Sequence, residues 1–137
     1  MSEESYDAAL ARKLRLKPGQ SALAVGAPEE YVAALRAALG ADAVMVEAGG
    51  RACDLVGLFA RSRAEVEAGA PVAIAAVRTG GALWIMWPKK TARQATDLDR
   101  DALWALIQPL GWGPVASVAV DKTWSGLRFR PEADIHH

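Results

Sequence analysis

Basic and aromatic residues stand directly after several apolar stretches of the chain, where strands would end. Cations in such places bind phosphate or carboxylate groups, and a tryptophan face can stack on a base or another ring. The alternative is that the cations are ordinary solvated loop residues and that the tryptophans belong to the core. The residues concerned are Arg61, Arg63, Lys89, Lys90, Lys122, Trp87 and Trp124.

Few other side chains suggest catalysis. Asp121 suits either a general base or a structural partner that caps its turn or pairs with Lys122, and no histidine or second carboxylate is evident nearby. His136 and His137 are terminal and no further ligand set is evident, so we predict no metal site. Cys53 is expected to be a small buried residue, and no serine or cysteine lies in a recognisable nucleophile elbow.

The composition is that of one globular domain spanning residues 1–137. Apolar residues make up 52% of the chain, and 16 Lys and Arg balance 16 Asp and Glu. A neutral chain has no overall field that would draw it to nucleic acid or an anionic membrane, so any basic patch must be local. With no basic leader and no apolar run near the ~20 residues that span a bilayer, we expect a cytoplasmic protein without membrane contact.

Short apolar segments alternate with amphipathic ones. A capping serine, Pro-Gly turns and a capping-box spacing mark the boundaries between them. We expect Gly69 and Pro71 to split the third helix into two pieces, the second reaching about Arg78, and Thr96 or Asp97 to cap the fourth. Strands are predicted at 21–25, 43–47, 54–60, 82–87, 115–120 and 127–130, and helices at 5–14, 28–39, 62–78 and 97–110.

This alternation predicts a three-layer, Rossmann-like α/β fold with a mostly parallel sheet of about six strands. The last strand returns through a turn without a helix, so it should be antiparallel to the strand before it. Parallel strands end at one edge of the sheet, where ligands usually bind. We call the cations expected there, with Trp87 and Trp124 beside them, the basic rim: Arg61, Arg63, Lys89, Lys90 and Lys122.

Three segments resemble the pattern of a family of short bacterial proteins that is catalogued as a domain of unknown function. The family pattern reads LWIxWPKK, TDL and VDxxWSGLxF, and the corresponding segments are residues 83–90, 96–98 and 120–129. The resemblance extends over nearly the whole chain, from the opening helix to Arg130. It implies no established activity.

The expected strand order also resembles a shortened class I methyltransferase. One early strand-helix unit would be missing, and the antiparallel strand would lie between the fourth and fifth strands. Such enzymes hold S-adenosylmethionine on a glycine-rich loop after the first strand, where this chain has only Gly26 followed by Pro28. The resemblance also implies an acidic residue that holds the ribose at the end of the second strand, and Glu47 stands there.

These observations favour a non-catalytic domain, without a predicted cofactor, that binds an anionic small molecule or a nucleotide-bearing partner. The expected site comprises the basic rim with Asp121 and Trp124. An alternative is a minimal S-adenosylmethionine-dependent methyltransferase that lacks the glycine-rich loop. A further alternative is an adaptor whose exposed tryptophan and lysine surface docks on another protein.

Overall fold

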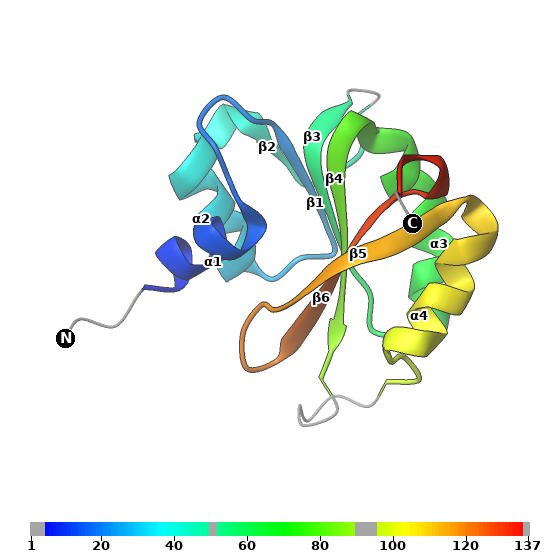
Figure 1. Ribbon diagram of the computed structural model, residues 1–137. Helices are drawn as coiled ribbons and strands as arrows, with labels where there is room; N and C mark the ends of the chain where they lie inside the picture. The colour runs from blue at the N-terminus through cyan, green and yellow to red at the C-terminus, as the bar shows by residue number, and fades with distance from the viewer. Residues whose placement is uncertain (1–4, 50–51, 90–95, 136–137) are drawn as a thin grey trace.

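A computed structural model describes residues 5–49, 52–89 and 96–135 (Figure 1). Its centre is one six-stranded sheet with the strand order β2-β1-β3-β4-β6-β5. The strands are β1 (Ala22–Val25), β2 (Val44–Met45), β3 (Cys53–Phe59), β4 (Val77–Pro88), β5 (Trp112–Ala119) and β6 (Trp124–Pro131).

The sheet is parallel except at β6. Strand β1 pairs in parallel with β2 and β3, and β3 pairs in parallel with β4. Strand β6 is antiparallel to both of its neighbours and lies between β4 and β5. The predicted α/β fold, including the antiparallel carboxyl-terminal strand between the fourth and fifth strands, is therefore confirmed.

Four helices cover the two faces of the sheet unequally. Helices α1 (Tyr6–Leu14) and α2 (Glu29–Leu39) pack on one face, and α3 (Arg63–Ala76) and α4 (Arg100–Ile107) pack on the other (Figure 1). The short 3-10 helices are η1 (Ala41–Ala43), η2 (Gln108–Leu110) and η3 (Glu132–Asp134).

Side-chain caps set where three of these helices begin. The hydroxyl oxygens of Ser5 and Ser62 accept hydrogen bonds from Ala8 N (3.1 Å) and Glu65 N (3.2 Å), as the sequence predicts. The prediction for the fourth helix is wrong by two to three residues. Its cap is Asp99, whose Oδ1 accepts a hydrogen bond from Ala102 N at 2.7 Å.

Helix α3 is continuous, so the predicted break at Gly69 and Pro71 is also wrong. A β-carbon added at Gly69 would lie 2.7 Å from Leu58 Cδ1, so glycine lets the helix approach β3 closely. Pro71 is inside the helix and exposed. An internal proline lowers helix stability by about 3 kcal/mol. Burial of the helix face that packs on the sheet offsets this loss, because burying one residue such as Val66 contributes roughly 1.5–3 kcal/mol.

The residues after α3 are strand and not the end of a helix. Strand β4 begins at Val77, which pairs with Cys53 of β3, five residues before the predicted start. The side chain of Arg78 forms an ion pair with Asp54, and this ion pair also holds the start of β3 and the start of β4 together. Tertiary pairing therefore overrides the local helical pattern at this point.

Alternate residues of the central strands enter two separate cores. Leu83 and Ile85 of β4 are fully buried on the α3/α4 face, whereas Trp84 and Met86 are buried on the α1/α2 face. Trp87 and Trp124 are 9% and 4% exposed, so both tryptophans of the predicted rim lie in the core. Cys53 is buried, as predicted.

The α1/α2 core contains a tightly packed contact between Tyr31 and Gly57. Tyr31 is fully buried, and its hydroxyl has no hydrogen-bond partner among the described residues. Its ring packs edge-on against Phe59 with a centroid separation of 4.6 Å. A β-carbon added at Gly57 would lie 2.7 Å from the Tyr31 hydroxyl oxygen, so this glycine provides the space that the hydroxyl occupies.

We therefore expect Gly57→Ala to destabilise the chain by about 1–3 kcal/mol through overpacking, and Tyr31→Phe to be nearly neutral because it removes an unpaired buried hydroxyl. In the double variant most of the Gly57→Ala penalty should disappear. Urea denaturation of the four chains measures this coupling. Gly49→Ala, where nothing lies within 4 Å of the added carbon, is the control. Equal penalties for Gly57→Ala with tyrosine or phenylalanine at position 31 would contradict the contact.

Candidate functional site

The carboxyl ends of β1, β3, β4 and β5 meet at one edge of the sheet, as the strand directions require. Two of the loops there are joined directly, because Lys89 N donates a hydrogen bond to Thr123 O at 2.8 Å. The sequence prediction placed the candidate site in these loops. What each predicted residue contacts decides whether it is available to a ligand.

Arg61 lies over the face of Trp124. Its guanidinium carbon is 5.1 Å from the ring centroid, a cation-π distance. The same guanidinium is 3.7 Å from the Glu65 carboxylate, and the Arg61 side chain is 42% exposed. Trp124 is itself packed edge-on against Phe59 at 4.9 Å. The buried ring therefore holds Arg61 in place, and a ligand at this point meets the guanidinium and not the ring.

Arg63 has a structural role. Its backbone N donates to Asp97 Oδ1 at 2.8 Å, and its side-chain Nε donates to Asp97 O at 3.2 Å. These contacts join the start of α3 to the segment before α4. Thr96 caps this segment locally, since its hydroxyl accepts a hydrogen bond from Leu98 N at 3.1 Å. Thr96 and Asp97, predicted to begin the helix, instead order the segment that precedes it.

The remaining cations of the basic rim differ in exposure. Lys89 is half-buried and Lys122 is exposed. Lys90 lies outside the described residues. The edge therefore offers Arg61, Lys89 and Lys122 to a ligand.

Asp121 caps the turn between β5 and β6. Its Oδ1 accepts hydrogen bonds from Thr123 N at 2.8 Å and Trp124 N at 2.9 Å. Of the two roles open from the sequence, these contacts support the structural one.

Negative charge also gathers at this edge, which the sequence prediction missed. Burial raises the pKa of the Tyr6 hydroxyl well above its usual value, and the carboxylates of Asp121, Glu30 and Asp7 raise it further. The Tyr6 hydroxyl is buried without a hydrogen-bond partner among the described residues. Tyr6 and Asp121 lie 115 residues apart in the sequence, so only the fold brings them close together.

The loop after β1 makes a close backbone contact with β3. Gly26 has a φ of 66°, and a β-carbon there would lie 3.0 Å from Phe59 O. Helix α2 follows at once with Pro28 as its N-cap, which makes no side-chain capping hydrogen bond. No side chain caps α2: Tyr31 N and Val32 N donate to Pro28 O at 3.1 and 3.2 Å, and the first two N–H groups of the helix are those of Glu29 and Glu30.

Glu47 stands two residues after the last residue of β2 that pairs with β1. Its side chain is exposed. The strand order places β2 and β3 on either side of β1, which makes the end of β1 a switch point of the topology. A ligand lying across the end of β1 would have Gly26 beneath it and Glu47 to one side.

No known sequence family matches the chain, and no curated protein matches it. The resemblance to a bacterial family of unknown function therefore stays a prediction. Solved structures do match in fold. The ribosomal protein L11 methylase of Lactobacillus delbrueckii subsp. bulgaricus superposes with a TM-score of 0.62 at 10% identity, over 92% of this chain and 76% of the methylase.

Two similar structures contain S-adenosylhomocysteine. The S-adenosylmethionine-dependent methyltransferase of Geobacter sulfurreducens has a TM-score of 0.59 at 14% identity, over 92% of this chain and 90% of that one. The magnesium protoporphyrin IX methyltransferase of Synechocystis PCC 6803 has a TM-score of 0.63 at 11% identity, over 90% of this chain and 80% of that one. At identities this low, the superpositions establish the fold alone: the chain has a class I methyltransferase-like Rossmann fold.

Two further findings concern the described residues. None of their helices is long and apolar enough to cross a membrane. They also contain no group of three or more His, Cys, Asp or Glu side chains placed to hold a metal ion.

The Asp121 cap can be tested by its effect on stability. We expect Asp121→Ala to lower the free energy of unfolding by about 1–2 kcal/mol, because two backbone N–H groups lose their acceptor. Asp121→Asn keeps an oxygen at that position and should recover most of the loss. Chemical denaturation measures both variants. An unchanged stability in Asp121→Ala would contradict the capping role.

Proposed function

We propose that this chain binds S-adenosylmethionine at the carboxyl ends of β1, β2 and β3 and acts as a minimal methyltransferase. The observation that carries the proposal is the close approach of Gly26 to Phe59 O at the switch point of the sheet. A β-carbon at this position would crowd Phe59 O, and the positive φ, which favours glycine, turns the chain directly into α2. The bound S-adenosylhomocysteine in two structures of similar fold supports the same assignment.

The charged groups around this loop suit an amino-acid head group. The backbone N–H groups of Glu29 and Glu30 at the start of α2 would bind a carboxylate, and the side chains of the same two residues would attract the ammonium and sulfonium charges. Glu47 would accept hydrogen bonds from the ribose hydroxyls. The chain departs from a glycine-rich loop at Pro28, which has no N–H to donate. The proposed site therefore relies on side-chain carboxylates more than on backbone donors.

When bound, S-adenosylmethionine would supply an activated methyl group for in-line transfer to a substrate nucleophile, with S-adenosylhomocysteine as the leaving group. Such a transfer needs alignment and exclusion of water more than a covalent catalyst, so a site of positioning residues is sufficient. The residues that would align the two reactants are those of the β1 and β3 loops. Arg61 and Lys122, at the ends of β3 and β5, would meet an anionic or electron-rich substrate beside the cofactor.

Isothermal titration calorimetry with S-adenosylmethionine and S-adenosylhomocysteine tests the proposal. We expect binding of both, and about tenfold weaker binding by Glu47→Gln, because a hydrogen bond to a charged acceptor contributes about 1.5–3 kcal/mol. Glu67→Gln, which removes an exposed carboxylate from α3, is the matched control. The absence of heat with either ligand at millimolar concentration would overturn the proposal.

A second candidate function is non-catalytic binding of an anionic or nucleotide-bearing ligand at the basic rim. The observation that favours it is the fixed guanidinium of Arg61 over Trp124 at the edge that Lys89 and Lys122 share. The adaptor alternative loses support at Trp124, which is buried, whereas the exposed tryptophan is Trp104 of α4.

A thermal-shift screen with nucleotides and inorganic phosphate tests the basic rim. A ligand that binds only the native state raises the melting temperature, and we expect Lys89→Ala combined with Lys90→Ala to reduce that rise by the part that the basic rim contributes. Arg36→Ala, a charge loss at the end of α2, should leave it unchanged. A rise that the double substitution does not reduce would place the anion elsewhere.

A further inference from the structure

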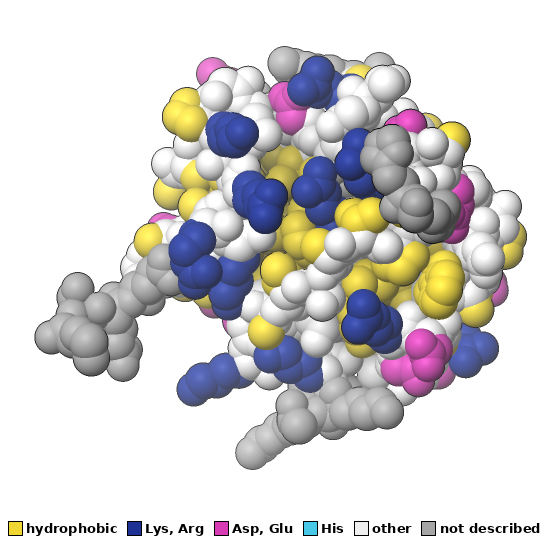
Figure 2. Space-filling view, in the orientation of Figure 1, with side chains coloured by type: hydrophobic (Ala, Val, Ile, Leu, Met, Phe, Trp, Pro, Cys, Tyr) yellow, Lys and Arg dark blue, Asp and Glu magenta, His cyan; other side chains and the backbone are white. Residues whose placement is uncertain are grey.

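A basic groove lies on the α1/α2 face of the sheet, where these helices leave β5 and β6 uncovered. It encloses about 510 Å³, within the range of small-molecule sites. Figure 2 shows Lys and Arg side chains around an apolar floor on this face. The charged residues that line the groove are Lys13, Arg15, Arg128, Arg130 and Asp134.

The groove is strongly positive although the whole chain is neutral. Four cations face one carboxylate, that of Asp134. Lys13 Nζ donates to Ala119 O at 2.7 Å, which holds the amine but leaves its charge uncompensated. A second pocket of about 250 Å³ shares Arg15 and Arg128 with the groove and adds Lys17 and Arg78. Its carboxylate, Asp54, already pairs with Arg78 and accepts a hydrogen bond from Ser21 N at 2.8 Å.

Two buried donors in the groove lack acceptors. Trp84 is 4% exposed, and its indole Nε1 has no hydrogen-bond partner among the described residues. The Nε of Arg128 is also buried without a partner in that part of the chain. An unpaired buried donor destabilises the fold, so an oxygen acceptor that reached both would stabilise it.

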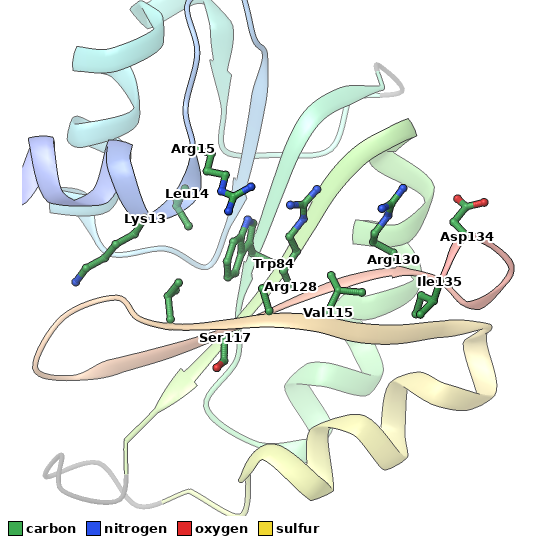
Figure 3. Close-up of a pocket in the computed structure, with 12 residues that line it drawn as sticks. Lys13, Leu14, Arg15, Trp84, Val115, Ser117, Arg128, Arg130, Asp134 and Ile135 are labelled. Atoms are coloured by element: carbon green, nitrogen blue, oxygen red, sulfur yellow. The ribbon is translucent and has the colours of Figure 1, made fainter. Parts of the chain in front are cut away.

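The sheet register places these two donors side by side. Trp84 of β4 is directly opposite Arg128 of β6, and directly opposite residues point to the same face. Arg130, two residues further along β6, points to that face as well. Figure 3 shows the Arg15, Arg128 and Arg130 side chains in a row, with the Trp84 indole directly below Arg15 in this view. Burial and the positive charges of Arg130 and Arg15 lower the pKa of Arg128, which reflects the lack of a facing anion.

We propose that this groove binds a terminal phosphate or pyrophosphate group, with Arg15, Arg128 and Arg130 around the phosphate oxygens and the Trp84 indole N–H as a further donor. Guanidinium groups bind phosphate oxygens in pairs. A terminal phosphate carries up to two negative charges and three free oxygens, whereas a phosphodiester carries one charge and two oxygens. The terminal group therefore matches a site with several converging donors.

The two donor nitrogens are shielded from solvent, so a ligand reaches them only when side chains that line the groove change rotamer, and Arg15 and Arg130 are exposed and free to do so. Exposed side chains change rotamer within nanoseconds. None of the residues that line the groove belongs to the basic rim, although Lys13 reaches the carboxyl end of β5 at Ala119. This proposal is therefore independent of methyl transfer.

Calorimetry with inorganic pyrophosphate and with inorganic phosphate tests the groove. We expect the wild-type chain to bind pyrophosphate, and Arg128→Gln and Trp84→Phe to bind it at least tenfold more weakly. Phenylalanine keeps an aromatic ring but removes the N–H. Arg100→Gln and Trp104→Phe, which alter exposed residues of α4 on the opposite face, are the matched controls. If Arg128→Gln or Trp84→Phe fails to fold, Arg15→Gln, at an exposed position, gives the same test.

A short RNA oligonucleotide without terminal phosphates distinguishes the source of the phosphate. Binding of pyrophosphate without binding of this oligonucleotide supports a terminal phosphate. Binding of the oligonucleotide alone would overturn the proposal in favour of a phosphodiester backbone. Failure to bind pyrophosphate at millimolar concentration, or equal affinity in Arg128→Gln, would also overturn it. Titration of the Glu47→Gln variant with pyrophosphate should give the wild-type affinity, because the two sites are separate.

Discussion

The pairing of β4 on both of its edges is the constraint on which the rest of the structure depends. Strand β3 fixes the register of β4 in parallel, and β6 fixes it in antiparallel. Leu83 and Ile85 are thereby committed to one core and Trp84 and Met86 to the other, and each fully buried aliphatic side chain contributes roughly 1.5–3 kcal/mol. A slip of one residue would exchange the two sets. The same register carries Lys89 to the carboxyl edge.

Unequal cover of the sheet explains why polar groups gather where they do. Helices α3 and α4 pack on one face, whereas α1 and α2 on the other leave part of β5 and β6 open, so that Val115 is 41% exposed. Arg128 alternates with Leu127 and Phe129, which are fully buried. Charged side chains thus occupy the face that a further helix would cover. Among the residues that line the groove, Asp134 is the one carboxylate that offsets the repulsion between these cations.

The sequence was sufficient to predict the mostly parallel sheet, its antiparallel last strand and the edge, because hydrophobic alternation and strand-helix-strand connections determine them. The position of β6 between β4 and β5 was implied by the resemblance to class I methyltransferases. It was not sufficient where tertiary contacts decide, as at Arg78, which the pairing of Val77 with Cys53 places in a strand despite a helical pattern. The role of Arg63 was hidden because its partner Asp97 is 34 residues away. The alternation around Arg128 was visible, but only the positions of the helices show that its face is open.

The two proposed sites differ in the sign of their charge, and this difference alone predicts different ligands. At the start of α2, the carboxylates of Glu29 and Glu30 favour a ligand that carries positive charge and disfavour phosphate. In the groove, Arg15 and Arg128 have the opposite preference. A neutral chain can thus bind ligands of opposite charge because each patch is local, and charges beyond about 10 Å are largely screened at physiological salt. A phosphate that occupies the groove would therefore leave the affinity for a sulfonium ligand at the carboxyl edge unchanged unless the two sites are linked through β4.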